Sequence, residues 1–192
     1  MKRLTRCRFA VVLLLAALLL TLALPSQTRA ADAAPAREPV VGLPCEGCEA
    51  VFVGMPAAPP AQARIAPASE PGEPLRIRGT VLTADGKPAA GVIVYAYQTD
   101  AGGLYPADPA TQQAGVRHGR LRGWARTDAS GGYQFDSIRP GGYPGTSIPQ
   151  HVHMHVIEPG RCTYYIDDIL FTDDPRLGAE ERASHDRGRG GS

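Results

Sequence analysis

The chain has 192 residues, enough for one domain of ordinary size and too few for two full ones. Its 20 lysines and arginines almost balance its 19 aspartates and glutamates, so the formal net charge is +1. No basic stripe interleaved with aromatic residues appears in the middle of the chain, which argues against nucleic acid as a partner.

Residues 1–30 have the order of a secretory signal. Basic residues precede an apolar run over residues 9–24, and small residues surround Ala30, after which we predict cleavage. The run is shorter than the roughly 20 apolar residues of a membrane span. We therefore expect export to the periplasm or the extracellular space, with no stable membrane span once the signal is removed.

Three cysteines remain after the predicted cleavage: Cys45, Cys48 and Cys162. In an oxidising compartment we expect one disulfide and one spare thiol, and all three pairings stay open. Cys45 and Cys48 also have the spacing of half a zinc knuckle or of a redox dithiol, but no second such pair accompanies them. A structural disulfide is the favoured interpretation.

Residues 31–72 are rich in alanine and proline, which predicts an extended arm. Within this arm, residues 45–55 have a composition able to dock on a domain, as an edge strand or through a disulfide. We expect residues 73–175 to form the folded domain. Residues 176–192 carry little apolar surface and are predicted to be a disordered tail.

The predicted domain contains short segments with the alternation or the β-branched content of strands. These segments are residues 75–82, 91–98, 122–127, 133–138, 151–157 and 164–171. Residues 122–127 and 133–138 flank a glycine-rich turn and are predicted to pair as a hairpin. Glycine and proline separate the segments and no long helical periodicity appears, so the predicted fold class is all-β, a β-sandwich.

A cluster of histidines lies in the fifth of these segments. His151, His153 and His155 alternate along it, and alternate residues of a strand share one face. A single histidine in a strand is usually a packing or surface residue, but imidazole is also the commonest nitrogen ligand of metals. Three imidazoles on one face favour a metal site, without indicating which metal.

Two tyrosines lie in turns upstream of the histidines. Tyr105 precedes a proline after a glycine pair, and Tyr143 lies between a glycine pair and a proline. Tyrosine is common in turns, where its hydroxyl often binds a backbone group, so either residue by itself has a structural interpretation. A phenol in such a turn could also project into a cleft instead of packing in the core.

The order of these motifs resembles that of the intradiol ring-cleavage dioxygenases, the family of protocatechuate 3,4-dioxygenase and catechol 1,2-dioxygenase. The matching words lie in residues 98–105, 126–135, 138–144 and 151–153, within a region of similarity over residues 73–174. The resemblance implies a β-sandwich that binds non-haem Fe³⁺ through Tyr105, Tyr143, His151 and His153. It also implies that Tyr143 is an axial ligand displaced by substrate, and that a catechol-type aromatic is cleaved with O₂ to a muconate-type diacid.

The chain departs from the family pattern beside the histidines. Members of the family usually carry an arginine three positions before the first histidine of the pair, whereas this chain has Ile148. The pocket wall therefore lacks a permanent positive charge at that position. His155 has no counterpart in the family pattern, and its spacing from His153 favours a supporting role over direct ligation. The sequence indicates neither which catechol is bound nor the oligomeric state.

Two alternatives remain open at the level of sequence. The strand and turn pattern also fits a non-catalytic β-sandwich module of the carboxypeptidase-regulatory or transthyretin-like type, which has no need for the two tyrosines and two histidines together. The other alternative is a degenerate member of the family that binds iron or a catechol without turnover, which Ile148 keeps open.

Overall fold

The computed structural model describes residues 40–42, 48–113 and 118–185 of the chain. The chain divides into two compact units, and all of the described residues belong to the second, Glu38–Ser192. The predicted signal at residues 1–30 and Cys45 therefore lie outside the described residues. In the described part of the chain, no helix is both long and apolar enough to cross a membrane.

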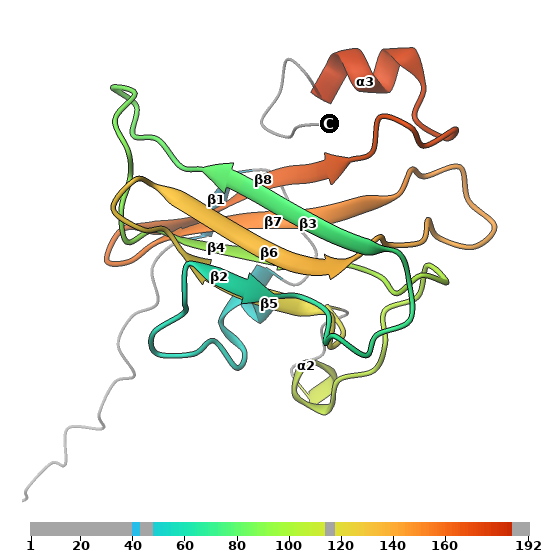
Figure 1. The fold of residues 1–192 in the computed structure, drawn as a ribbon, viewed down its shortest axis with the longest axis horizontal. Helices are drawn as coiled ribbons and strands as arrows, with labels where there is room; N and C mark the ends of the chain where they lie inside the picture. The colour runs from blue at the N-terminus through green and yellow to red at the C-terminus, as the bar shows by residue number, and fades with distance from the viewer. Residues whose placement is uncertain (1–39, 43–47, 114–117, 186–192) are drawn as a thin grey trace, which may run out of the picture. The chain divides into compact units, whose positions relative to one another are not determined.

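Strands dominate the described residues, as Figure 1 shows, and this confirms the all-β prediction. The elements are β1 (Val40–Gly42), η1 (Cys48–Phe52), β2 (Gln62–Arg64), β3 (Pro74–Thr80), β4 (Ile93–Tyr97), α2 (Pro109–Gln113), β5 (Arg122–Arg126), β6 (Gly132–Ile138), β7 (His151–Glu158), β8 (Cys162–Leu170) and α3 (Ala179–His185). The predicted strand segments from residue 75 onward each correspond to one of these strands, with ends that differ by a few residues.

The strands form two sheets. The larger has the order β1-β8-β7-β4-β5, and the smaller has the order β2-β6-β3, which crosses the larger sheet in Figure 1. One apolar cluster joins them, with Ile77 and Phe135 from the smaller sheet and Val94, Val152 and Met154 from the larger. The two sheets therefore pack face to face as the predicted β-sandwich.

The larger sheet is also covered on its other face, which we call the outer face. All five residues of β4 are buried, because Val94 and Ala96 point into the sandwich while Ile93, Tyr95 and Tyr97 pack on the outer side. A second cluster forms there with Val51 of η1. The indole nitrogen of Trp124 donates to the Val51 carbonyl at 2.7 Å and holds η1 against the sheet.

The hairpin predicted between residues 122–127 and 133–138 is wrong. β5 pairs with β4 in the larger sheet, whereas β6 pairs with β2 and β3 in the smaller one. The turn between them carries the chain from one sheet to the other, and the Asp128 carboxylate stabilises it by accepting from the backbone of Ser130 and Gly132 at 2.8 and 2.9 Å. A tight turn fixes a change of direction, but partners for the strands are chosen by packing across the core.

The folded domain begins before residue 73, in contrast to the predicted extended arm. β1 pairs in parallel with β8, and β2 pairs in parallel with β6. Ile65 and Ala66, just after β2, are buried in the sandwich core. Edge strands pair through backbone groups, which an alanine- and proline-rich composition does not reveal.

Cys48 is disulfide-bonded and Cys162 carries a free thiol, in agreement with the predicted single bridge and one spare thiol.

The segment predicted to be a disordered tail, residues 176–192, differs from that prediction as far as residue 185, because α3 forms there. Leu177 is buried ahead of α3, and Arg182 donates to the Thr172 carbonyl at 2.8 Å, so these contacts offset part of the ordering entropy.

Candidate metal centre

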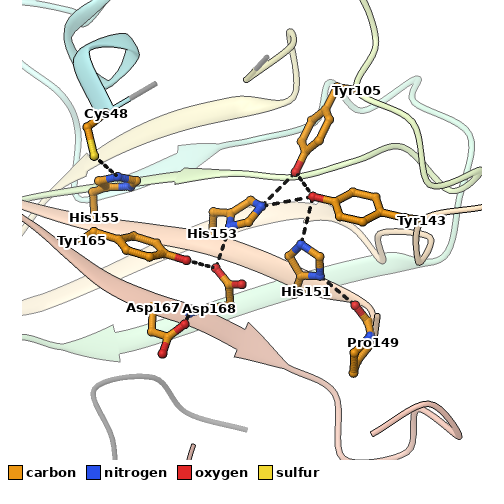
Figure 2. A network of polar contacts seen from close by, with 10 residues as sticks. All are labelled: Cys48, Tyr105, Tyr143, Pro149, His151, His153, His155, Tyr165, Asp167 and Asp168. Carbon is orange, nitrogen blue, oxygen red and sulfur yellow. Dashed lines mark hydrogen bonds and ion pairs between the residues drawn. The ribbon is translucent and has the colours of Figure 1, made fainter. Parts of the chain in front are cut away.

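Strand β7 places the histidines on the outer face of the larger sheet. Val152 and Met154 point into the sandwich core, so His151 and His153, which alternate with them along the strand, point to the other side. Their rings lie 4.6 Å apart and nearly perpendicular, at 76°. Figure 2 shows both imidazoles directed toward the hydroxyls of Tyr105 and Tyr143.

Two loops that hold each other supply the tyrosines. Tyr105 follows β4, and Tyr143 lies between β6 and β7. The backbone nitrogen of Gly141 donates to the Asp100 carbonyl at 2.8 Å, and the hydroxyl of Thr99 donates to the Gly141 carbonyl at 2.7 Å. Gly141 packs so closely on the Ala101 backbone that a Cβ there would collide with it. The glycines in these turns therefore permit the approach that brings the two phenols together.

The four predicted ligand atoms converge. The hydroxyls of Tyr105 and Tyr143 are 2.5 Å apart, and the Tyr105 hydroxyl is 2.9 Å from His153 Nε2. The Tyr143 hydroxyl is 3.4 Å from His153 Nε2 and 3.2 Å from His151 Nε2. The structure thus brings all four sequence-predicted residues into one cluster of two oxygens and two nitrogens.

These separations fit one shared cation. First-row metal ions bind nitrogen and oxygen donors at about 2.0–2.2 Å, so two donors of one ion lie roughly 2.8–3.5 Å apart. Three of the four separations fall in that range, and the phenol pair is slightly closer. The donor set is therefore compatible in geometry with a single metal ion.

The pKa shifts of Tyr105 and His151 are also compatible with a metal ion at this cluster. Burial, and then the hydrogen bond with Tyr143, raises the pKa of Tyr105 far above its ordinary value. Burial, and then the neighbouring His153, lowers the pKa of His151. The imidazole of His151 thus remains neutral with a lone pair available to bind a metal, whereas the Tyr105 phenol ionises only if a strongly charged cation replaces its proton.

Asp168 lies beside the histidines and was not among the residues predicted from the sequence. His151, His153 and Asp168 form a group with potential metal-binding atoms within 4.8 Å of one another. However, Asp168 Oδ1 lies 2.6 Å from His153 Nδ1, on the side of the ring away from the tyrosines. Asp168 therefore orients His153 instead of joining the four convergent donors.

Several further groups hold the imidazoles in place. His151 Nδ1 lies 2.7 Å from the Pro149 carbonyl, and the Tyr165 hydroxyl donates to Asp168 Oδ1 at 2.9 Å. Although burial opposes ionisation, the hydrogen bond from His153 and the nearby imidazoles hold the pKa of Asp168 below its ordinary value. Tyr97 stacks on the His153 ring at 4.4 Å, so that ring is confined on its edge and on one face.

His155 occupies a different environment from the other two histidines. Its side chain is fully buried, with Nε2 4.0 Å from the Cys48 sulfur and its ring against Tyr95 and Tyr165. Burial, and then His118, lowers the pKa of His155 to about 3. His155 therefore packs against η1, and Figure 2 shows it away from the hydroxyls of Tyr105 and Tyr143.

Ile148 lies in the exposed loop that leads from Tyr143 to β7, and 45% of its surface is accessible. A guanidinium reaches this loop from another segment, because Arg176 Nη1 donates to the carbonyls of Tyr143 and Ile148 at 3.4 and 3.3 Å. The carboxylate of Asp174 accepts from the Gln150 backbone at 2.6 Å. Hydrogen bonds from Asp174 and Arg176, in the segment after β8, thus hold the loop that carries Tyr143 and Ile148.

A family model described as "Dioxygenase" matches residues 51–185, which is well over half of the chain and includes all four convergent residues. The chain belongs to the intradiol dioxygenase family. The match begins at residue 51, so it also includes β2, which the predicted domain boundary at residue 73 had left out.

The family contains the curated relatives that the chain resembles. It is 30% identical over 120 residues to the protocatechuate 3,4-dioxygenase beta chain of Burkholderia cepacia, covering 55% of this chain and 48% of that protein. It is 33% identical over 114 residues to catechol 1,2-dioxygenase 2 of Acinetobacter lwoffii, covering 51% of this chain and 40% of that protein. The chain thus spans about half or less of the length of these relatives.

A solved structure shows the same fold. The 3-chlorocatechol 1,2-dioxygenase of Rhodococcus opacus 1CP matches with a TM-score of 0.51 at 23% identity, over 65% of this chain and 55% of that chain. At this level of identity the likeness concerns the fold alone. It agrees with the two-layered sheet architecture described above.

Proposed function

We propose that this chain is a non-haem, Fe³⁺-dependent intradiol dioxygenase that cleaves a catechol-type aromatic with O₂ to a muconate-type diacid. The observation that carries the proposal is the convergence of the Tyr105 and Tyr143 hydroxyls with the Nε2 atoms of His151 and His153. Membership of a family of iron enzymes that act on catechol-type substrates supports it.

The donor chemistry favours the ferric state. Two phenol oxygens supply two negative charges when ionised, and hard anionic oxygens suit Fe³⁺ better than Fe²⁺. Two neutral imidazoles complete the set without adding charge, and their Nδ1 atoms are already engaged by Pro149 and Asp168. When bound, the ion would supply Lewis acidity and a template for substrate and O₂.

The protein residues would bind and orient the substrate around this set. We propose that Tyr143 is the ligand that a catechol displaces, because it lies in a loop whose following residues, 144–148, are exposed. Tyr105 follows a buried strand and would remain in place with the histidines. A displaced Tyr143 phenolate oxygen is a base, suited to accept a proton from the incoming catechol hydroxyl.

A visible absorption spectrum of the Fe³⁺-loaded protein tests the proposal, recorded before and after anaerobic addition of catechol. We expect a broad tyrosinate-to-iron charge-transfer band that shifts when catechol binds. Tyr105→Phe should weaken or remove the band, whereas Tyr164→Phe, a tyrosine of β8 outside the convergent set, should leave it unchanged. Absence of the band in the native protein would remove the dioxygenase proposal and favour a non-catalytic sandwich module.

Admission of air then separates catalysis from binding. Consumption of O₂ with formation of a ring-opened diacid is the expected result. A band that shifts with catechol but gives no product would support the alternative of an iron- or catechol-binding protein, for which the uncharged Ile148 beside the site is the motivating feature.

We also propose that the protein is exported, on the basis of the signal-like order of residues 1–30. Fractionation of cells that produce the full chain, with mass spectrometry of its N-terminus, tests this proposal. Recovery of the mature protein in the exported fraction with a terminus near Ala31 is expected, and a cytoplasmic protein with an intact N-terminus would contradict it.

A further inference from the structure

We propose that Asp168 is a positioning residue of the metal centre, whose carboxylate fixes the tautomer of His153 and increases electron donation from that imidazole. Tyr165 moderates the effect by sharing the same carboxylate oxygen. The electronic part of this inference rests on the proposed iron site, whereas the tautomer part concerns the metal-free protein as well.

An irregularity in β8 creates the arrangement. The register between β7 and β8 shifts at Met154 and His155, so that Asp167 lies opposite Met154 while Tyr165 lies opposite His155. The register against β7 skips Ile166, and Asp167 has a φ of 81°. In a regular strand, residues three apart point to opposite faces. The bulge therefore puts both Tyr165 and Asp168 on the outer face beside His153.

The two histidines of the centre consequently differ in their supporting groups. His151 Nδ1 faces the neutral carbonyl of Pro149 at 2.7 Å, whereas His153 Nδ1 faces a carboxylate at 2.6 Å. Both partners accept a proton from Nδ1 and so leave Nε2 as the metal-binding atom. Only the carboxylate adds negative charge, which strengthens the imidazole as a donor and stabilises a more highly charged ion.

The environment of Asp168 strengthens this effect. Its side chain is only 18% exposed, so water screens the charge less than at the surface. The same oxygen that accepts from His153 also accepts from the Tyr165 hydroxyl at 2.9 Å. Removal of that hydroxyl leaves the carboxylate more basic toward His153. Substitutions at Asp168 and Tyr165 should thus have opposite electronic effects.

Asp168→Asn tests the inference, because an asparagine oxygen can still accept from His153 without the charge. We expect Fe³⁺ affinity to fall about 10–100-fold, the reduction potential of the iron to rise, and the charge-transfer band to move to longer wavelength. Asp167→Asn is the matched control. It removes the same charge one residue away, its amide oxygen can still accept from the Asp168 backbone, and asparagine tolerates a positive φ. It should leave all three quantities unchanged.

Tyr165→Phe distinguishes electronic tuning from general damage. We expect the potential to fall and the band to move to shorter wavelength, opposite to Asp168→Asn. A shift in the same direction for both variants would overturn the tuning, as would equal effects of Asp167→Asn and Asp168→Asn.

The tautomer is measured separately by ¹⁵N NMR of the metal-free protein. His153 should carry its proton on Nδ1, and a proton on Nε2 would overturn the positioning role whatever the iron measurements give. If the native protein forms no charge-transfer band, the proposed function fails while the tautomer measurement still decides the inference. If the native band is present and Asp168→Asn does not change its wavelength, the inference fails and the proposed function stands.

Discussion

The two faces of the five-stranded sheet differ in what the same strands contribute to them. On the inner face, β4 and β7 supply Val94, Ala96, Val152 and Met154 to the sandwich core. On the outer face, the alternate residues include two tyrosines of β4 and three histidines of β7, among them the imidazoles of the candidate metal centre. Neighbouring residues of one strand therefore serve packing and chemistry separately, and substitutions one position apart should have different consequences.

The largest expected effect is on metal binding from the outer face. His153→Ala and Tyr105→Phe each remove one of the four convergent donors, and each should abolish or sharply weaken Fe³⁺ binding. Titration of the purified variants with Fe³⁺, followed by metal analysis, measures this. Normal iron occupancy in both variants would show that the ligand assignment is wrong.

The next effect is on stability from the inner face. Met154→Ala leaves a cavity in the sandwich core, one residue along β7 from His153, and should lower the free energy of unfolding by about 2–5 kcal/mol. Urea unfolding of the metal-free protein measures the loss. The charge-transfer band of the iron-loaded variant should keep its wavelength, and a large shift of that band would mean that the two faces are not independent.

The third effect concerns acid stability and again belongs to the outer face. Folded His155 has a pKa of about 3 and thus remains neutral well below 6.5, where the unfolded residue takes up a proton. Because the unfolded state binds more protons, the free energy of unfolding should fall between pH 6.5 and 3, by up to about 1.4 kcal/mol per pH unit from this group.

His155→Gln should make that acid slope shallower in the metal-free protein, measured by urea unfolding at a series of pH values. Met154→Ala, which removes no titratable group, is its control and should keep the native slope. The prediction fails if the slopes of His155→Gln and the native protein coincide.

The smallest structural effect is expected at the rim of the centre. Ile148→Arg introduces the charge that the family resemblance leads us to expect at this position, and because Ile148 is exposed, stability should change by no more than about 0.5 kcal/mol. Activity on simple catechols should change nonetheless. Leu82→Arg adds the same charge at another exposed position, beyond the Thr80 end of β3, and should leave activity unchanged. Equal activities of all three proteins would refute the argument about position 148.

Much of the fold was predictable from local pattern. Alternation and β-branched runs placed the strands from residue 75 onward, because burial on one face imposes a period of two on the sequence. Strand alternation indicated the histidines as metal ligands, but the two tyrosines were predictable as ligands only through the family resemblance, since neither by itself differs from an ordinary turn residue. Their flanking glycines and prolines gave the signal.

The remaining features depended on tertiary structure. Which strands pair is decided across the core, so a turn that looks like a hairpin joins two sheets, and the strands of residues 40–64 pair through backbone groups that leave no mark in composition. The bulge in β8 likewise depends on the pairing of two strands. A strict period of two puts Tyr165 and Asp168 on opposite faces, and only the register against β7 brings both to His153. The sequence by itself determined the donor residues and the strands that carry them. Tertiary pairing decided which groups support those donors, because a register shift is a property of two strands and not of one.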